Sequence, residues 1–153
     1  MTNKTKGYLL VAGQFILLIA LFVIPNNKDI LVITPWLPQL SFIFLIPGVF
    51  ILLLSFLGLG SSLTANPVPK DNSQLVTDGL YKLVRHPIYT GLLLLGLSLV
   101  LNAGIFPHVL VWLVLAVLLN YKAKFEESLL MKRYPEYVEY ASKTGRFIPR
   151  LKR

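Results

Sequence analysis

The chain has 153 residues, of which 55% are hydrophobic and 14% charged, with a formal net charge of +8 and no cysteine. This length suits one domain, and the apolar excess over soluble proteins indicates a membrane as the solvent. Disulfides, thiolate metal sites and a cysteine nucleophile are excluded, and the basic residues flank apolar runs in a way that favours anionic lipid headgroups over nucleic acid as their partner.

Two apolar runs in the first 60 residues predict membrane-spanning helices. The first covers residues 7–24, contains no charged residue and is followed at once by Pro25. About 20 helical residues cross the hydrocarbon core, so this run is long enough to span with modest thinning of the bilayer. The second covers residues 39–60, with Pro47 as an expected kink. Two prolines interrupt residues 31–38, which we expect to form an interfacial or re-entrant loop.

The remaining chain predicts a loop, a helical hairpin and a helical tail. Residues 61–86 contain an irregular polar stretch and are expected to form a cytosolic loop. Residues 87–101 and 107–121 are apolar arms separated by a turn signal, and each arm is short for a full crossing. Residues 122–134 are expected to continue as a polar-faced helix. Residues 135–143 carry aromatic side chains on one face, which predicts an amphipathic helix on the bilayer or on the hairpin.

These elements predict an all-α membrane protein with four transmembrane helices, the last two a hairpin, followed by cytosolic or interfacial C-terminal helices. We expect one membrane domain over residues 1–153, with two N-terminal spans in residues 1–60 and the C-terminal helices and tail in residues 122–153. With four spans, every Lys and Arg except Lys28 lies on the side of both termini. The positive-inside rule makes that side cytoplasmic, and we expect a prokaryotic plasma membrane.

The segment 74–91 carries the first concentration of chemically useful side chains. Pro87 fixes its own φ and favours an extended His86, so the imidazole is expected at the membrane surface just outside the third span. Tyr89 follows within the first helical turn, and Gly91 would let backbone approach closely at a pocket wall. Each residue also has a topological explanation, as a membrane anchor, a helix start or an interfacial aromatic. That explanation does not account for their coming together.

A second concentration lies at the end of the fourth predicted span. Lys122 and Glu126 are four residues apart and therefore share a helical face. Glu126 and Glu127 are adjacent carboxylates at a membrane boundary, which repel each other unless a cation meets them. The ammonium of a bound ligand is one candidate for that cation. For Glu127 we favour the simpler interpretation of an exposed charge on a solvated helix.

The order of these motifs resembles the membrane-embedded isoprenylcysteine carboxyl methyltransferase and phospholipid methyltransferase group. Residues 75–81 read LVTDGLY and residues 85–91 read RHPIYTG, followed by the apolar hairpin and the pair of glutamates. Residues 134–137 then read YPEY, and residues 146–149 read RFIP. The resemblance covers about residues 74–149, roughly half of the chain.

The resemblance implies an S-adenosylmethionine-dependent methyltransferase acting on a membrane lipid or lipidated substrate, such as a prenylcysteine carboxylate. The residues that it implies for the cofactor pocket are Gln74, Leu75, Val76, Tyr81, His86, Pro87, Tyr89 and Glu126. A substrate-binding arginine of the family corresponds here to Lys122, which keeps the charge but loses the bidentate fork. Lys122 and Arg146 are the candidate catalytic residues, which would orient an anionic substrate group. The sulfonium methyl is already activated, so we expect no metal and no covalent residue.

Two other functions are compatible with parts of the sequence. Membrane sterol reductases have a similar Arg-His-Pro-x-Tyr stretch and a later acidic pair, and they use NADPH. They also use more spans, and the chain shows no separate dinucleotide motif. A non-catalytic membrane scaffold would explain the polar residues by topology and packing alone. The methyl acceptor, whether a carboxylate, a phospholipid amine or another small lipid, and the oligomeric state are left open.

Overall fold

The structure, a computed structural model, describes residues 1–26, 34–69, 73–103 and 106–150. Over these residues it is helical, without strands, which confirms the all-α class. The elements are α1 (Asn3–Val23), α3 (Leu37–Leu59), the short 3-10 turns Gly60–Ser62 and Gly79–Lys82, α4 (Pro87–Ala103), α5 (His108–Arg133) and α6 (Tyr137–Lys143). Three of the helices, α1, α3 with its 3-10 extension, and α5, are long and apolar enough to cross a membrane, while α4 is a shorter apolar helix.

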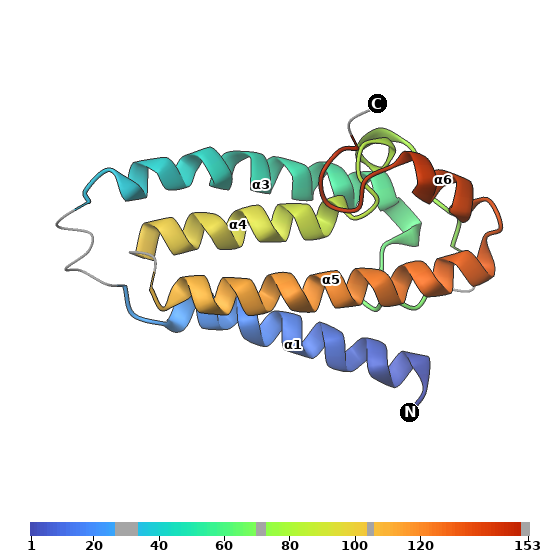
Figure 1. The fold of residues 1–153 in the computed structure, drawn as a ribbon, viewed down its shortest axis with the longest axis horizontal. Coiled ribbons are helices and arrows are strands. Elements are labelled where there is room, and N and C mark those ends of the chain that lie inside the picture. The colour runs from blue at the N-terminus through green and yellow to red at the C-terminus, as the bar shows by residue number, and fades with distance from the viewer. Residues whose placement is uncertain (27–33, 70–72, 104–105, 151–153) are drawn as a thin grey trace.

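The helices α1, α3, α4 and α5 run alongside one another and alternate in direction (Figure 1). Across the view they lie in the order α3, α4, α5, α1, and contacts join α3 to α4, α4 to α5, and α1 to both α4 and α5. The N-terminus, residues 60–69 and 73–86, and α6 all lie at one end of this bundle. The segments with the predicted chemistry are therefore gathered at that end.

The interior of the bundle is made by small and aliphatic side chains from α1, α4 and α5. Leu21, Leu115, Leu119 and Ala123 are buried there together with the ring of Tyr89. These contacts bring the C-terminal part of α1 against α5, the helix that carries Lys122 and Glu126. The bundle therefore fixes the relative position of α1, α4 and α5 beside the site.

Glycine at position 91 allows α3 and α4 to approach closely. A Cβ added to Gly91 would lie 2.7 Å from Leu52 Cγ and 3.1 Å from the carbonyl oxygen of Gly48. Small residues at such contacts let helix backbones pack at short range. Gly91 thus faces α3 and not a ligand pocket, so the expectation that it opens a pocket wall is wrong.

Helix α5 continues without a break to Arg133, which confirms the expectation that the helix over residues 107–121 runs on into the polar-faced stretch after residue 121. One predicted boundary needs correction. The predicted loop over residues 31–38 ends earlier than expected, since Leu37 begins α3 and Pro38 is accommodated in its first turn, where a missing backbone N–H costs little. Residues 31–33 lie outside the described residues. Pro47 is inside α3 as predicted.

Candidate functional site

The C-terminal segment after α6 lies against the residues that precede α4. The backbone N–H of Arg85 donates to the carbonyl of Gly145 at 2.8 Å, and that of His86 donates to the carbonyl of Arg146 at 3.1 Å. The hydroxyl of Thr90 then donates to the carbonyl of Phe147 at 2.9 Å. Backbone groups are satisfied in this way without a regular sheet. The tail is thereby fixed beside the first turn of α4.

The turn within this tail requires glycine at position 145. A Cβ added there would lie 1.8 Å from the carbonyl oxygen of Ile148. No side chain fits at that distance, and the obstructing atom belongs to the backbone. The same turn brings the ring of Phe147 edge-on to His86 and Tyr89, at centroid distances of 6.1 Å and 6.4 Å.

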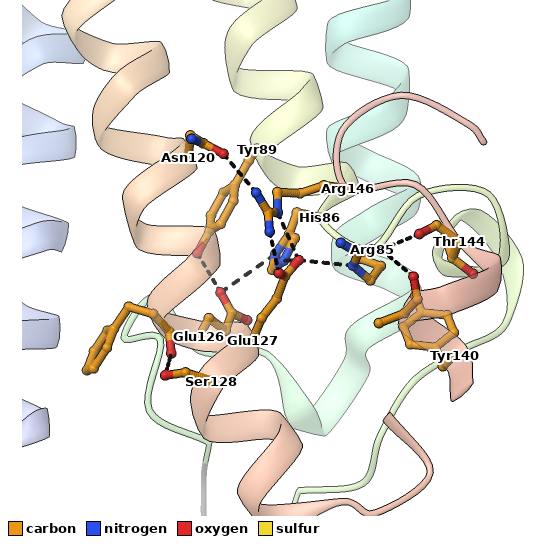
Figure 2. Close-up of polar contacts among 12 residues, drawn as sticks. Arg85, His86, Tyr89, Asn120, Glu126, Glu127, Ser128, Tyr140, Thr144 and Arg146 are labelled. Atoms are coloured by element: carbon orange, nitrogen blue, oxygen red, sulfur yellow. Dashed lines mark hydrogen bonds and ion pairs between the residues drawn. The ribbon is translucent and has the colours of Figure 1, made fainter. Parts of the chain in front are cut away.

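Five polar side chains form what we call the Glu127 cluster: Glu127, Arg85, His86, Asn120 and Arg146 (Figure 2). Glu127 accepts from Arg85 Nε at 2.9 Å and from Arg146 Nη2 at 2.7 Å. Arg146 Nη1 also donates to Asn120 Oδ1 at 3.1 Å. With an exposed fraction of 4%, Glu127 is buried, so its interpretation as an exposed charge is wrong. Two guanidinium groups of the protein therefore neutralise this carboxylate.

The Glu127 cluster also determines which ring nitrogen of His86 carries the proton. His86 Nε2 lies 3.1 Å from Glu127 Oε1, and an ionised carboxylate can only accept a hydrogen bond. Nε2 is therefore the protonated nitrogen. His86 Nδ1 lies on the other side of the ring, 3.8 Å from Glu126 Oε2. In a neutral ring this nitrogen is an acceptor directed to the side of Glu126.

Glu126 and Lys122 share a face of α5 different from that of Glu127, on the side of Tyr89 and of His86 Nδ1. The hydroxyl of Tyr89 donates to Glu126 Oε2 at 2.7 Å, and the glutamate side chain remains 28% exposed. Lys122, one turn earlier, is 2% exposed; its Nζ donates to Gln14 Oε1 at 2.7 Å and lies 5.1 Å from the centroid of the Tyr89 ring. Among the described residues, no carboxylate lies within salt-bridge distance of this ammonium.

A cavity of about 460 Å³ adjoins this face of α5. Its volume falls in the range of about 300 to 1,000 Å³ that is usual for small-molecule and cofactor sites. The predicted cofactor residues all contribute to its wall, and so does Lys122: Gln74, Leu75, Val76, Tyr81, His86, Pro87, Tyr89, Lys122 and Glu126. Arg146 is not among the lining residues, because Glu127 and Asn120 bind its guanidinium.

Three phenols line the cavity beside the tail. Burial raises the pKa of Tyr140 to about 12 and holds the pKa values of Tyr81 and Tyr137 well above the ordinary range. All three are therefore neutral at physiological pH. The hydroxyl of Tyr140 donates to the carbonyl of Tyr81, which ties α6 to the 3-10 turn before α4. This wall offers aromatic faces and neutral polar groups to a ligand.

Two features of the site were missed by reasoning from sequence. Gln14 is the only amide in the charge-free run 7–24, and an amide inside a span is costly unless it is bonded, which was a usable signal. The pairing of Glu127 with Arg85 gave no such signal, because the two residues are 42 positions apart. The pattern of residues 74–91 did identify the segment that forms the cavity wall.

Fold and site together define an all-helical membrane protein with a largely apolar cavity, lined also by several polar side chains, at one end of its bundle. The chain belongs to the isoprenylcysteine carboxyl methyltransferase family, whose model matches residues 40–132. It is 41% identical over 86 residues to the cobalt-zinc-cadmium resistance protein CzcN of Cupriavidus metallidurans, covering 54% of this chain and 38% of that protein. The nickel-cobalt-cadmium resistance protein NccN of Alcaligenes xylosoxydans xylosoxydans is 31% identical over 86 residues, covering 54% and 39%. The chain thus matches about two fifths of the length of either relative.

Proposed function

We propose that the protein transfers the methyl group of S-adenosylmethionine to a membrane-borne lipid or lipidated substrate, of which a prenylcysteine carboxylate is one example. The family membership implies methyl transfer. The observation that carries the proposal is the convergence of the family pattern on one cavity: segment 74–76, the residues around His86, and Glu126 of α5 all line it. These segments are far apart in sequence, and packing alone does not require their polar groups to meet.

The side chains around the cavity fit the chemical groups of this cofactor. Glu126 and His86 Nδ1 are hydrogen-bond acceptors side by side, which suits the ammonium of an amino-acid end. Aromatic rings and the apolar residues Leu75 and Val76 suit a nucleoside. The positively charged Lys122 lies one turn away and suits an anionic group of the acceptor. Bound there, the cofactor supplies an activated sulfonium methyl.

The protein has to align the acceptor with that methyl and exclude water. A carboxylate acceptor is already anionic, so it attacks without losing a proton. An amine acceptor must lose a proton, which passes to water or to a basic group of the cavity. Either acceptor is compatible with the polar groups of the cavity, and neither requires a metal.

We further propose that the chain forms a single membrane domain with four spans, in which α4 crosses a thinned bilayer or extends into the headgroups. The alternating direction of the helices supports this arrangement, since it gathers the N-terminus, residues 61–69 and 73–86, and residues 122–150 at one end. The Lys and Arg residues of those segments favour the cytoplasm for that end, and with it a prokaryotic plasma membrane. The cofactor would enter from this side and the lipid between the helices.

Methyl-labelled S-adenosylmethionine tests the proposed reaction. The protein is reconstituted in vesicles made from total membrane lipid, incubated with the labelled cofactor, and the lipid fraction is separated and analysed. We expect label in a lipid or lipidated product, and its loss when excess S-adenosylhomocysteine is added. Absence of transfer, together with thermal stabilisation by NADPH and not by S-adenosylhomocysteine, would overturn the proposal in favour of a reductase.

A further inference from the structure

The amide of Gln14 lies in the middle of α1 and holds the ammonium of Lys122 inside the cavity. Gln14 is 8% exposed, and its Oε1 accepts from Lys122 Nζ at 2.7 Å. Both side chains contribute to the cavity wall. Because an ammonium can only donate, the amide oxygen has to face it, which orients the amide. The NH2 group of Gln14, which has no hydrogen-bond partner among the described residues, is left as a donor beside the ammonium.

Among the described residues, Lys122 has Glu126 within electrostatic range but forms no salt bridge. An ammonium has three hydrogen-bond donors, and one of them is used by Gln14. The ring of Tyr89 offers its face at 5.1 Å, while Glu126 is engaged by the hydroxyl of the same tyrosine at 2.7 Å. Over residues 1–26, 34–69, 73–103 and 106–150, no carboxylate lies within salt-bridge distance of Lys122. A buried ammonium without a salt-bridge partner favours the binding of an anionic ligand, since burying an unpaired charge is costly.

Aromatic side chains of two helices border the same cavity. Phe15 of α1 is 52% exposed and Phe56 of α3 is 43% exposed, and both line the cavity. In a membrane protein such exposed rings face acyl chains. A ligand that reaches Lys122 past these rings would meet apolar walls first and the charge afterwards, which suits an amphiphile with an anionic head.

We propose that Gln14 and Lys122 together recognise an anionic oxygen group, a carboxylate or a phosphate, on an amphiphilic methyl acceptor. Gln14 is a positioning and specificity residue: it holds the ammonium in place and adds an amide donor to it. This inference rests on the proposed function. It assigns a role to α1, which lies outside the segment 40–132 matched by the family model.

The test measures binding to the detergent-solubilised protein saturated with S-adenosylhomocysteine. The first two probes are N-acetyl-S-farnesylcysteine, which has a free carboxylate, and its methyl ester, which does not. We expect wild type to bind the carboxylate about tenfold or more tightly than the ester, as hydrogen bonds to charged groups allow. Lys122→Met should remove this preference, and so should Gln14→Glu, because it supplies Lys122 with a carboxylate of its own. Lys122→Arg should retain it.

A matched control is available on the same pair of helices. Lys6 of α1 lies over the rings of Tyr121 and Phe125 of α5, at 4.9 Å and 4.5 Å, and does not line the cavity. Lys6→Met removes the same charge from the same helix interface and should bind like wild type. Should Gln14→Glu fail to fold, the double variant Gln14→Leu with Lys122→Met replaces both partners by apolar groups, which is nearly neutral for stability. It should also lose the preference.

Two further probes separate the sources of the anion. Farnesyl phosphate should bind in preference to the uncharged ester, and inorganic phosphate should bind far more weakly than farnesyl phosphate. Equal binding of carboxylate and ester by wild type, or an undiminished preference in Gln14→Glu or in the double variant, would overturn the inference. Equal affinity for inorganic phosphate and farnesyl phosphate would contradict the proposal that the methyl acceptor is amphiphilic. Failure of wild type to bind S-adenosylhomocysteine would instead refute the proposed function, so the two failures are distinguishable.

Discussion

Glu126 and Glu127 are neighbours on α5, yet the protein treats the two carboxylates differently. Successive helical residues point about 100° apart, so one side chain faces the tail and the other faces the cavity. Glu127 is enclosed and receives hydrogen bonds from Arg85, His86 and Arg146 (Figure 2). Glu126 receives one from Tyr89 and keeps about a quarter of its side chain exposed. The comparison teaches that the carboxylate neutralised by protein cations holds the tail and α4 together, while the partly exposed one is left as the carboxylate that we propose for ligand binding.

The largest expected effect on stability comes from removing the charge of Glu127. Glu127→Gln leaves two guanidinium groups without their carboxylate in a buried setting, which typically costs about 3 to 5 kcal/mol. We expect a strong drop in melting temperature in detergent, measured by circular dichroism. A variant that melts like wild type would show that the Glu127 cluster does not hold the tail in place.

A smaller loss is expected when the tail itself is displaced. Gly145→Ala places a methyl group against the carbonyl of Ile148, and overpacking of this kind costs about 1 to 3 kcal/mol. The tail should detach locally, so the amides of Arg85 and His86, whose acceptors are carbonyls of the tail, should exchange with deuterium faster. Hydrogen exchange measured by mass spectrometry tests this. Unchanged protection of these amides from exchange would show that the tail does not hold the residues before α4 in place.

The smallest effect is expected at an exposed pair on α6. A hydrogen bond from Lys143 lowers the pKa of Glu139, so this contribution to stability is present above the unfolded pKa and is lost as pH falls through the folded pKa. Both side chains are exposed, and such pairs contribute little. Glu139→Gln should therefore melt almost like wild type at neutral pH, and any difference should vanish in acid. A drop in melting temperature as large as that of Glu127→Gln would contradict the contrast between exposed and buried carboxylates.

The sequence predicted the helices well because apolar runs and prolines are local signals. The continuation of α5 past Tyr121 was predicted as well, because the residues up to Arg133 remain good helix formers although the hydropathy changes there. The sequence also predicted the segments of the cavity wall, through a resemblance carried by short ordered motifs. The burial of Glu127 and the contact between Gln14 and Lys122, which are 108 positions apart, depend on tertiary packing that no local pattern encodes.

We propose that Glu126, and not its neighbour, faces the cofactor, and isothermal titration with S-adenosylhomocysteine tests this most directly. We expect wild type and the control Lys6→Met to bind with similar affinity. Glu126→Gln should keep the melting temperature within a few degrees of wild type but bind about tenfold or more weakly, because one charged hydrogen-bond acceptor for the ammonium is lost. Equal binding by wild type and Glu126→Gln, or no binding by wild type, would contradict the account.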